Sequence, residues 1–178
     1  MPLNSTRGAA SAKGFGFGAS NQFYLGARGV FAGGEFTNVI DYITIQSAGN
    51  ATDFGDLTNA RGASCGASSK TRLVNCSGAA GGSQTNVLDY VTIASTGNAI
   101  DFGDDFSTSD GTSGSASNNT RGLFAGGYAP GRNTNTIRFI TIASVGDTTD
   151  FGDLTVGRYQ IQTAINSSTR AVWAGGNT

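Results

Sequence analysis

The sequence predicts an all-β protein built from four-stranded units of about 49 residues. One pattern occurs three times, at Val39–Asp56, Val87–Asp104 and Thr136–Asp153, and successive copies start 48 and 49 residues apart. Within each copy, short apolar runs with period-2 alternation are separated by turn residues, which is the signature of strands rather than helices. A period of this length is typical of repeat architectures such as β-propellers, in which each repeat is one supersecondary unit.

A second motif is a short alternating strand that ends on small residues, R-G-V-F-A-G-G in its first copy. It occurs at Arg28–Gly34, Arg72–Gly78, Arg121–Gly127 and Arg170–Gly176. A glycine pair at a strand end permits positive φ and close backbone approach. Residues 28–178 therefore contain three and a half repeats of this kind.

Residues 1–27 form a Gly/Ala-rich N-terminal segment. Within it, Asn4–Arg7 (N-S-T-R) is similar to the later hairpin tip Asn118–Arg121 (N-N-T-R). Two interpretations remain open for this segment: a degenerate first strand of the repeat, or a leader that docks on another protein.

The connection after the glycine pair is the part of the repeat whose length changes most. It spans Glu35–Asn38 in the first copy, Ala79–Asn86 in the second and Tyr128–Asn135 in the third, or four, eight and eight residues. Length variation confined to one connection predicts surface loops on one face of the molecule.

The strand that follows, Val39–Ile45, is apolar on both faces. Ile40 and Tyr42 point one way, and Val39, Ile43 and Ile45 point the other. Burial on both faces predicts a sheet packed between two like sheets, as in a propeller blade. Asp41, Asp89 and Arg138 occupy one equivalent position near the strand start, where we expect a rim of the sheet.

Each copy ends on the tetrapeptide D-F-G-D. Paired carboxylates could suggest a calcium site. Its recurrence in three copies favours a structural role, because a catalytic site is normally unique. We therefore expect Phe54, Phe102 and Phe151 in the core between units, with the aspartates at turns.

Composition limits the possible functions. The chain has 178 residues, a formal net charge of −1 and no histidine. The balanced charge argues against nucleic-acid binding, which needs clustered Lys and Arg. Without histidine, the commonest general base and metal ligand are missing. The sequence predicts a protein that is not an enzyme, without cofactors or metal. Since no apolar run approaches the roughly 18 residues of a spanning helix, it also predicts no membrane insertion.

The two cysteines, Cys65 and Cys76, flank a predicted hairpin tip almost symmetrically and could be cross-strand neighbours. A disulfide and a buried thiol pair both remain open. Cys76 stands where the other copies have Ala32, Ala125 and Ala174, which favours a small core residue.

The repeats resemble two groups of known proteins. Strands that end in a glycine pair, followed by N-[VI]-x-[YF] and by an Arg-containing segment such as Gly55–Arg61, look like kelch repeats, with phenylalanine in place of the usual tryptophan. The pattern [YF]-[IV]-T-I-A-S-x-G-[ND]-x-x-D-F-G-D with F-A-G-G is similar to repeats in structural proteins of tailed bacteriophages, especially of marine bacteria. This resemblance covers nearly the whole chain and implies a tail, fibre or capsid-surface role in the virion, with assembly in the host cytoplasm.

These observations favour a phage tail fibre or tail-associated adhesin that contacts the host surface. A capsid decoration or head-fibre protein is the alternative, and a propeller glycan depolymerase is a third, less favoured one. The expected partners are other virion proteins, a host surface glycan or protein, and further copies of the chain. Self-association is expected through unpaired β edges, because three and a half repeats leave edges open, including Ala171–Ala174 with Trp173.

The variable connections are the predicted binding face, with Tyr128, Arg132, Glu35 and Phe36 as contact residues. Tyr128 offers a flat amphipathic ring for a sugar or an apolar patch. Arg132 offers a forked donor for the carboxylates or phosphates of bacterial surface polymers. An ordinary solvated rim is the alternative interpretation of these connections.

Overall fold

The computed structural model describes residues 27–34, 37–107, 113–129, 131–161 and 164–178. Within these ranges every regular element is a β-strand, and all strand pairing is antiparallel between neighbours in the chain, which confirms the predicted all-β class. Sheet I contains β1 (Arg28–Ala32), β2 (Val39–Thr44) and β3 (Thr52–Asp56). Sheet II contains β4 (Cys65–Ser68), β5 (Arg72–Ala80), β6 (Ser83–Thr92) and β7 (Ile100–Asp104). Sheet III contains β8 (Gly114–Ser117), β9 (Arg121–Ala129), β10 (Arg132–Thr141) and β11 (Thr149–Asp153). Sheet IV contains β12 (Ile165–Asn166) and β13 (Ala171–Val172).

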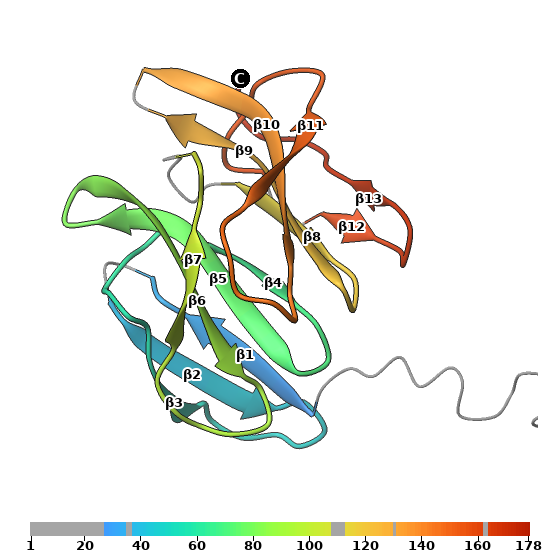
Figure 1. Cartoon of the computed structure of the whole chain (residues 1–178). Coiled ribbons are helices and arrows are strands. Elements are labelled where there is room, and N and C mark those ends of the chain that lie inside the picture. The colour runs from blue at the N-terminus through green and yellow to red at the C-terminus, as the bar shows by residue number, and fades with distance from the viewer. Residues whose placement is uncertain (1–26, 35–36, 108–112, 130, 162–163) are drawn as a thin grey trace, which may run out of the picture.

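Sheets II and III are the predicted four-stranded units, each a meander in chain order. Figure 1 shows the sheets stacked in sequence, with sheet I at the bottom, sheet II in the middle and sheet III above it. The described part of sheet I has the last three strands of a unit, and sheet IV has the first two. The described sheets do not close into a ring.

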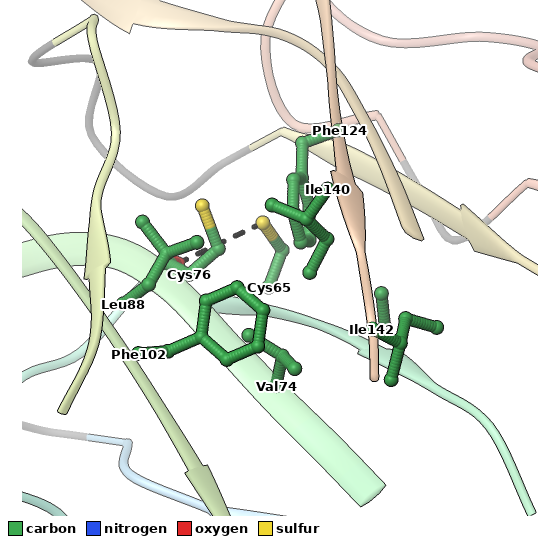
Figure 2. Close-up of a cluster of buried hydrophobic side chains, with 9 residues drawn as sticks. Cys65, Val74, Cys76, Leu88, Phe102, Phe124, Ile140 and Ile142 are labelled. Carbon is green, nitrogen blue, oxygen red and sulfur yellow. Dashed lines mark hydrogen bonds between the residues drawn. The ribbon is translucent and has the colours of Figure 1, made fainter. Parts of the chain in front are cut away.

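The core lies between successive sheets, as two-sided apolar strands require. The core between sheets I and II contains Ile40, Phe54 and Leu57 with Val91 of β6. The core between sheets II and III joins Phe102 and Leu88 to side chains of β9 and β10, among them Phe124 and Ile140 (Figure 2). The expected burial of Phe54 and Phe102 is therefore confirmed. Phe151 on β11 is 52% exposed, because sheet III lacks a complete sheet on that side.

The position shared by Asp41, Asp89 and Arg138 is not at a rim in sheets II and III. The side chains of Asp89 and Arg138 are fully buried. Each is met by an opposite charge from the segment that precedes its sheet, so a charged residue near the strand start is accommodated inside the stack. The expectation of a rim position was wrong for these two residues.

The connections predicted as eight-residue loops are extended hairpins. Strand β5 continues to Ala80 and β6 starts at Ser83, so the connection is a two-residue turn. That turn is Gly81-Gly82, with φ of 56° and 84°. Positive φ at both turn residues matches the twist of the flanking strands. The third repeat has the same arrangement, with Ala129 opposite Arg132.

Candidate functional site

The candidate site is the pair of projecting hairpins, here called the arms: residues 79–86 of sheet II and 128–135 of sheet III. Both reach out on the same side of the stack (Figure 1). Gln84 Nε2 donates a hydrogen bond of 3.0 Å to the Tyr128 carbonyl, so the two arms are direct neighbours. The stacked sheets thus place two exposed turns next to each other.

Tyr128 and Arg132 lie on the same arm but on opposite faces of it. Tyr128 pairs with Asn133, and Arg132 pairs with Ala129. Side chains of consecutive strand residues alternate between faces, while cross-strand partners share one. The structure therefore does not bring the two predicted contact residues into one cluster. Glu35 and Phe36 lie outside the described residues.

The face of the arm that carries Tyr128 is aromatic. The rings of Tyr128 and Tyr159 are 5.4 Å apart with planes tilted by 55°. The Tyr128 residue keeps 37% of its surface exposed. Tyr159 follows sheet III in the chain, and sequence reasoning missed it because it lies outside the variable connections. Two adjoining phenol rings form an amphipathic surface of the kind that binds sugar rings or apolar patches.

A buried ion pair joins sheet II to the segment before it. Arg61 Nη2 lies 2.5 Å from Asp89 Oδ1, and both side chains are fully buried. Asp89 Oδ2 also accepts hydrogen bonds from the Thr58 amide, at 2.9 Å, and the Thr58 hydroxyl, at 2.8 Å. Both carboxylate oxygens are thus occupied by donors from residues 58–61.

A second buried ion pair joins sheet III to the segment before it, with the charges exchanged. Arg138 Nη1 lies 3.3 Å from Asp105 Oδ2, again with both side chains fully buried. Asp105 further accepts hydrogen bonds from the hydroxyl of Thr148, at 2.8 Å, and of Ser77, at 2.9 Å. Sequence reasoning missed Asp105 as a partner of Arg138, although the change from Asp to Arg at the strand position was a readable signal.

Both ion pairs tie a sheet to the segment that precedes it. Both carboxylates are fully buried, and each accepts hydrogen bonds from neighbouring donors in addition to facing its arginine. Among the described residues, no group of three or more Asp, Glu, Cys or His side chains is arranged to hold a metal ion. In the same ranges, no helix has the length and apolarity needed to cross a bilayer.

The two cysteines are cross-strand partners, as the sequence suggested. Cys65 on β4 pairs with Cys76 on β5, and both are buried free thiols. Figure 2 shows them in the core between sheets II and III, with the Cys65 thiol 3.8 Å from the Cys76 carbonyl. Burial raises the pKa of the Cys76 thiol well above its usual value, and the neighbouring Cys65 and Asp105 raise it further. Cys76 is therefore a packed thiol rather than a nucleophile at neutral pH.

The chain was compared with protein-family models and with curated proteins. None of the family models matches, and neither does any of the curated proteins.

Proposed function

We propose that this protein is a non-catalytic structural and attachment protein of a phage particle, a tail fibre or tail-associated adhesin. The observation that carries the proposal is the pair of neighbouring arms held out by stacked sheets. Binding residues are commonly displayed on projecting connections of a rigid scaffold. Here Tyr128 and Tyr159 give one arm an amphipathic aromatic surface.

The repeat pattern supports the virion setting, because it resembles repeats in structural proteins of tailed phages. The finer fold we propose is a kelch-like propeller fragment, in which each four-stranded sheet is one blade. Stacked, twisted sheets with a core between each successive pair are the arrangement of propeller blades. The buried ion pairs serve this scaffold by fixing how neighbouring blades pack.

Location and copy number are tested on purified particles by quantitative mass spectrometry and immunogold labelling. We expect the protein in tens of copies, with label on the tail. Hundreds of copies with label over the head would favour the capsid decoration alternative. Absence from particles would contradict both.

The binding role is tested on the arms. We expect Tyr128→Ala to weaken adsorption to host cells, because it removes half of the aromatic pair. Arg132→Ala is a separate variant, since its side chain projects from the opposite face. Phe106→Ala is the matched control, because it removes an exposed ring that lies on neither arm. Unchanged adsorption with both arm variants would place the binding face elsewhere, at the hairpin tips such as residues 69–71.

A further inference from the structure

Each unit has two faces, which we name by their neighbours. The leading face meets the preceding sheet, and the trailing face meets the following one. On the leading face of sheet III, Phe124 is fully buried, whereas the equivalent Phe31 of sheet I is 59% exposed. On the trailing face, Phe102 of sheet II is 2% exposed, whereas Phe151 of sheet III is 52% exposed. The stack therefore ends on two faces whose equivalents are buried between the inner sheets.

The inner junctions share one backbone contact. Gly97 N donates to Phe54 O at the first junction, and Gly146 N donates to Phe102 O at the second, both at 2.7 Å. The corresponding donor on sheet I is Gly49, and the corresponding acceptor on sheet III is Phe151. The leading face of sheet I thus carries the donor position of this hydrogen bond, and the trailing face of sheet III carries the acceptor position.

Glycine in the fourth strand allows this close approach. A Cβ added at Gly103 would lie 2.6 Å from the carbonyl atoms of Gly146. At Gly152, the equivalent residue on β11, no described atom lies within 4 Å of that point. Sheet III therefore has the clearance for a following turn.

An arginine side chain makes the second shared contact. Arg28 Nη1 donates to Ile93 O at 2.8 Å, and Arg72 Nη1 donates to Ile142 O at 3.1 Å. In each case the arginine of one sheet reaches the end of the third strand in the next sheet. The next arginine in this series is Arg121, and the remaining acceptor position is Ile45 O on sheet I.

The ion pair is the third contact, and it is selective. Residues 154–158 (L-T-V-G-R) match residues 57–61 (L-T-N-A-R), so Thr155 and Arg158 stand where Thr58 and Arg61 bind Asp89. Arg158 also packs against the second glycine of a glycine pair, as Arg61 does. Its Cδ lies 3.4 Å from the point where a Cβ would sit on Gly176, as that of Arg61 does for Gly78.

Asp41 on sheet I is the equivalent of Asp89. Neither Asp41 nor Arg158 has an ion-pair partner among the described residues. A sheet bearing Asp at this position cannot follow Asp105, because two carboxylates would then meet without water. A sheet with Asp at this position can instead follow the segment that contains Arg158, because the two charges are opposite. The charges therefore favour the trailing face of sheet III as the partner of sheet I.

We propose that two copies of this chain associate head to tail, with sheet I of one copy packed on the trailing face of sheet III of the other. In this arrangement, Asp41 of one copy accepts hydrogen bonds from Thr155 of the other copy. Asp41 also forms an ion pair with Arg158 of that other copy. The two surfaces belong to different copies because sheets I and III lie at opposite ends of the stack (Figure 1). The inference concerns assembly alone and holds whether or not the arms bind a host surface.

Strand β13 occupies part of the position that sheet I would take. Arg170–Gly176 (R-A-V-W-A-G-G) nearly repeats Arg28–Gly34 (R-G-V-F-A-G-G), and only Ala171 and Val172 of it pair with β12. A groove lies between sheet III and the β12–β13 hairpin, lined by Leu123 and Phe151 on one side and by residues 166–171 on the other. In the assembly, β1 of the second copy replaces β13 and gains β12 as its outer neighbour.

The count of sheets favours a closed ring of two copies. Counting only the described strands, β12 brings sheet I of the other copy to four, so the described parts of two copies supply six four-stranded sheets. Propellers typically have about four to eight blades. A head-to-tail contact forms a ring when its rotation closes.

The test uses the full chain and two charge reversals, Asp41→Arg and Arg158→Asp. We expect the unaltered chain to have twice the mass of one chain in sedimentation equilibrium. Each reversal should weaken association on the order of a hundredfold, since it leaves like charges at a buried contact. An equimolar mixture of the two variants should regain the dimer, because opposite charges then meet at both of its contacts. At one contact the introduced arginine faces the introduced aspartate, and at the other the unaltered Asp41 faces the unaltered Arg158.

Asp101→Arg is the matched control, because it makes the same charge change at an exposed residue of the middle sheet. It should leave the dimer intact, and circular dichroism should show the same strand content in all variants. A monomeric unaltered chain would overturn the proposal. A dimer that tolerates both reversals would overturn it too, as would two weakened variants whose mixture stays monomeric. An intact dimer together with unaffected host adsorption in the arm variants would separate this inference from the attachment role.

Discussion

The two inner junctions of the stack make the same backbone contacts but carry opposite buried charges. At the first junction the following sheet supplies the acid, Asp89, and the linking segment supplies Arg61. At the second the sheet supplies the base, Arg138, and the segment supplies Asp105. The backbone contacts are common to both junctions, whereas the buried charge at this one position differs between them.

The junctions also differ in apolar content. Among the described residues, the core between sheets II and III contains nine buried residues with one half-buried residue packed against them, whereas the core between sheets I and II contains four buried and five half-buried ones. Because burial of apolar area is the main stabilising term, the second junction should be the more stable one. The first junction therefore depends more on its ion pair, and substitutions at each junction can test that difference.

The largest effect is expected from Asp89→Ala at the first junction. Removal of the acid leaves the Arg61 guanidinium buried without a counter-charge, which destabilises a protein by about 3–5 kcal/mol. Urea unfolding followed by circular dichroism measures the loss. Asp101→Ala, an exposed acid on the same sheet, should stay within about 0.5 kcal/mol. A loss for Asp89→Ala no larger than that of the control would show that the pair contributes little to the junction.

A second comparison concerns the same phenylalanine position on two trailing faces, buried in sheet I and half-exposed in sheet III. Phe54→Ala empties a buried site and should lower the free energy of unfolding by about 3 kcal/mol, the lower end of the range for such truncations. Phe151→Ala should lower it by no more than about 1 kcal/mol, since half of that residue is exposed. Both are measured in the Asp41→Arg background, so that association does not bury Phe151. Equal losses would contradict the open trailing face.

The second ion pair should be replaceable as a unit. Asp105→Leu alone removes the acid that faces the buried Arg138, but Leu57 and Leu154 already occupy the same position as Asp105 in the other two segments. The double variant Asp105→Leu with Arg138→Leu should therefore be more stable than either single variant. A double-mutant cycle should give a coupling energy of about 0.5–3 kcal/mol. Additive losses would indicate that Asp105 acts mainly through Ser77 and Thr148.

Much of the fold was readable from the sequence because the repeat supplies its own alignment. Three aligned copies indicated most strands and the turn after the third strand, and they suggested that Cys65 and Cys76 could be cross-strand neighbours, which the structure confirms. The extended arms could have been predicted as well, since Gly81-Gly82 between alternating residues is a two-residue hairpin turn. Once a two-residue turn is assumed, the alternation of side chains along each strand places Tyr128 and Arg132 on opposite faces of the hairpin.

The buried ion pairs were harder to predict. The rim position predicted for Asp89 and Arg138 rests on one strand alone, where a charge near the start indicates an exposed end. Their partners lie 28 and 33 residues earlier in the chain, in the segments that precede each sheet. A comparison of those segments between repeats would have shown Arg61 matched with Asp89 and Asp105 with Arg138. The aromatic contact of Tyr159 with Tyr128 depends on packing across a junction, which a single repeat does not encode.

The smallest effect is expected at a core position where the side chains of equivalent residues differ by a single atom. Sheets I and III have Ala32 and Ala125 where sheet II has Cys76, so Cys76→Ala should lower stability at pH 7 by about 1 kcal/mol or less. Its pH dependence is more informative. Burial raises the pKa of Cys76 in the folded protein. The unfolded chain therefore loses this proton first, and stability falls as pH rises above the ordinary thiol pKa of about 8.5. Urea titrations between pH 7 and about pH 10 should show this decline in the unaltered chain and a smaller one in Cys76→Ala. Identical slopes would mean that the Cys76 thiol is no harder to ionise in the folded core than in the unfolded chain.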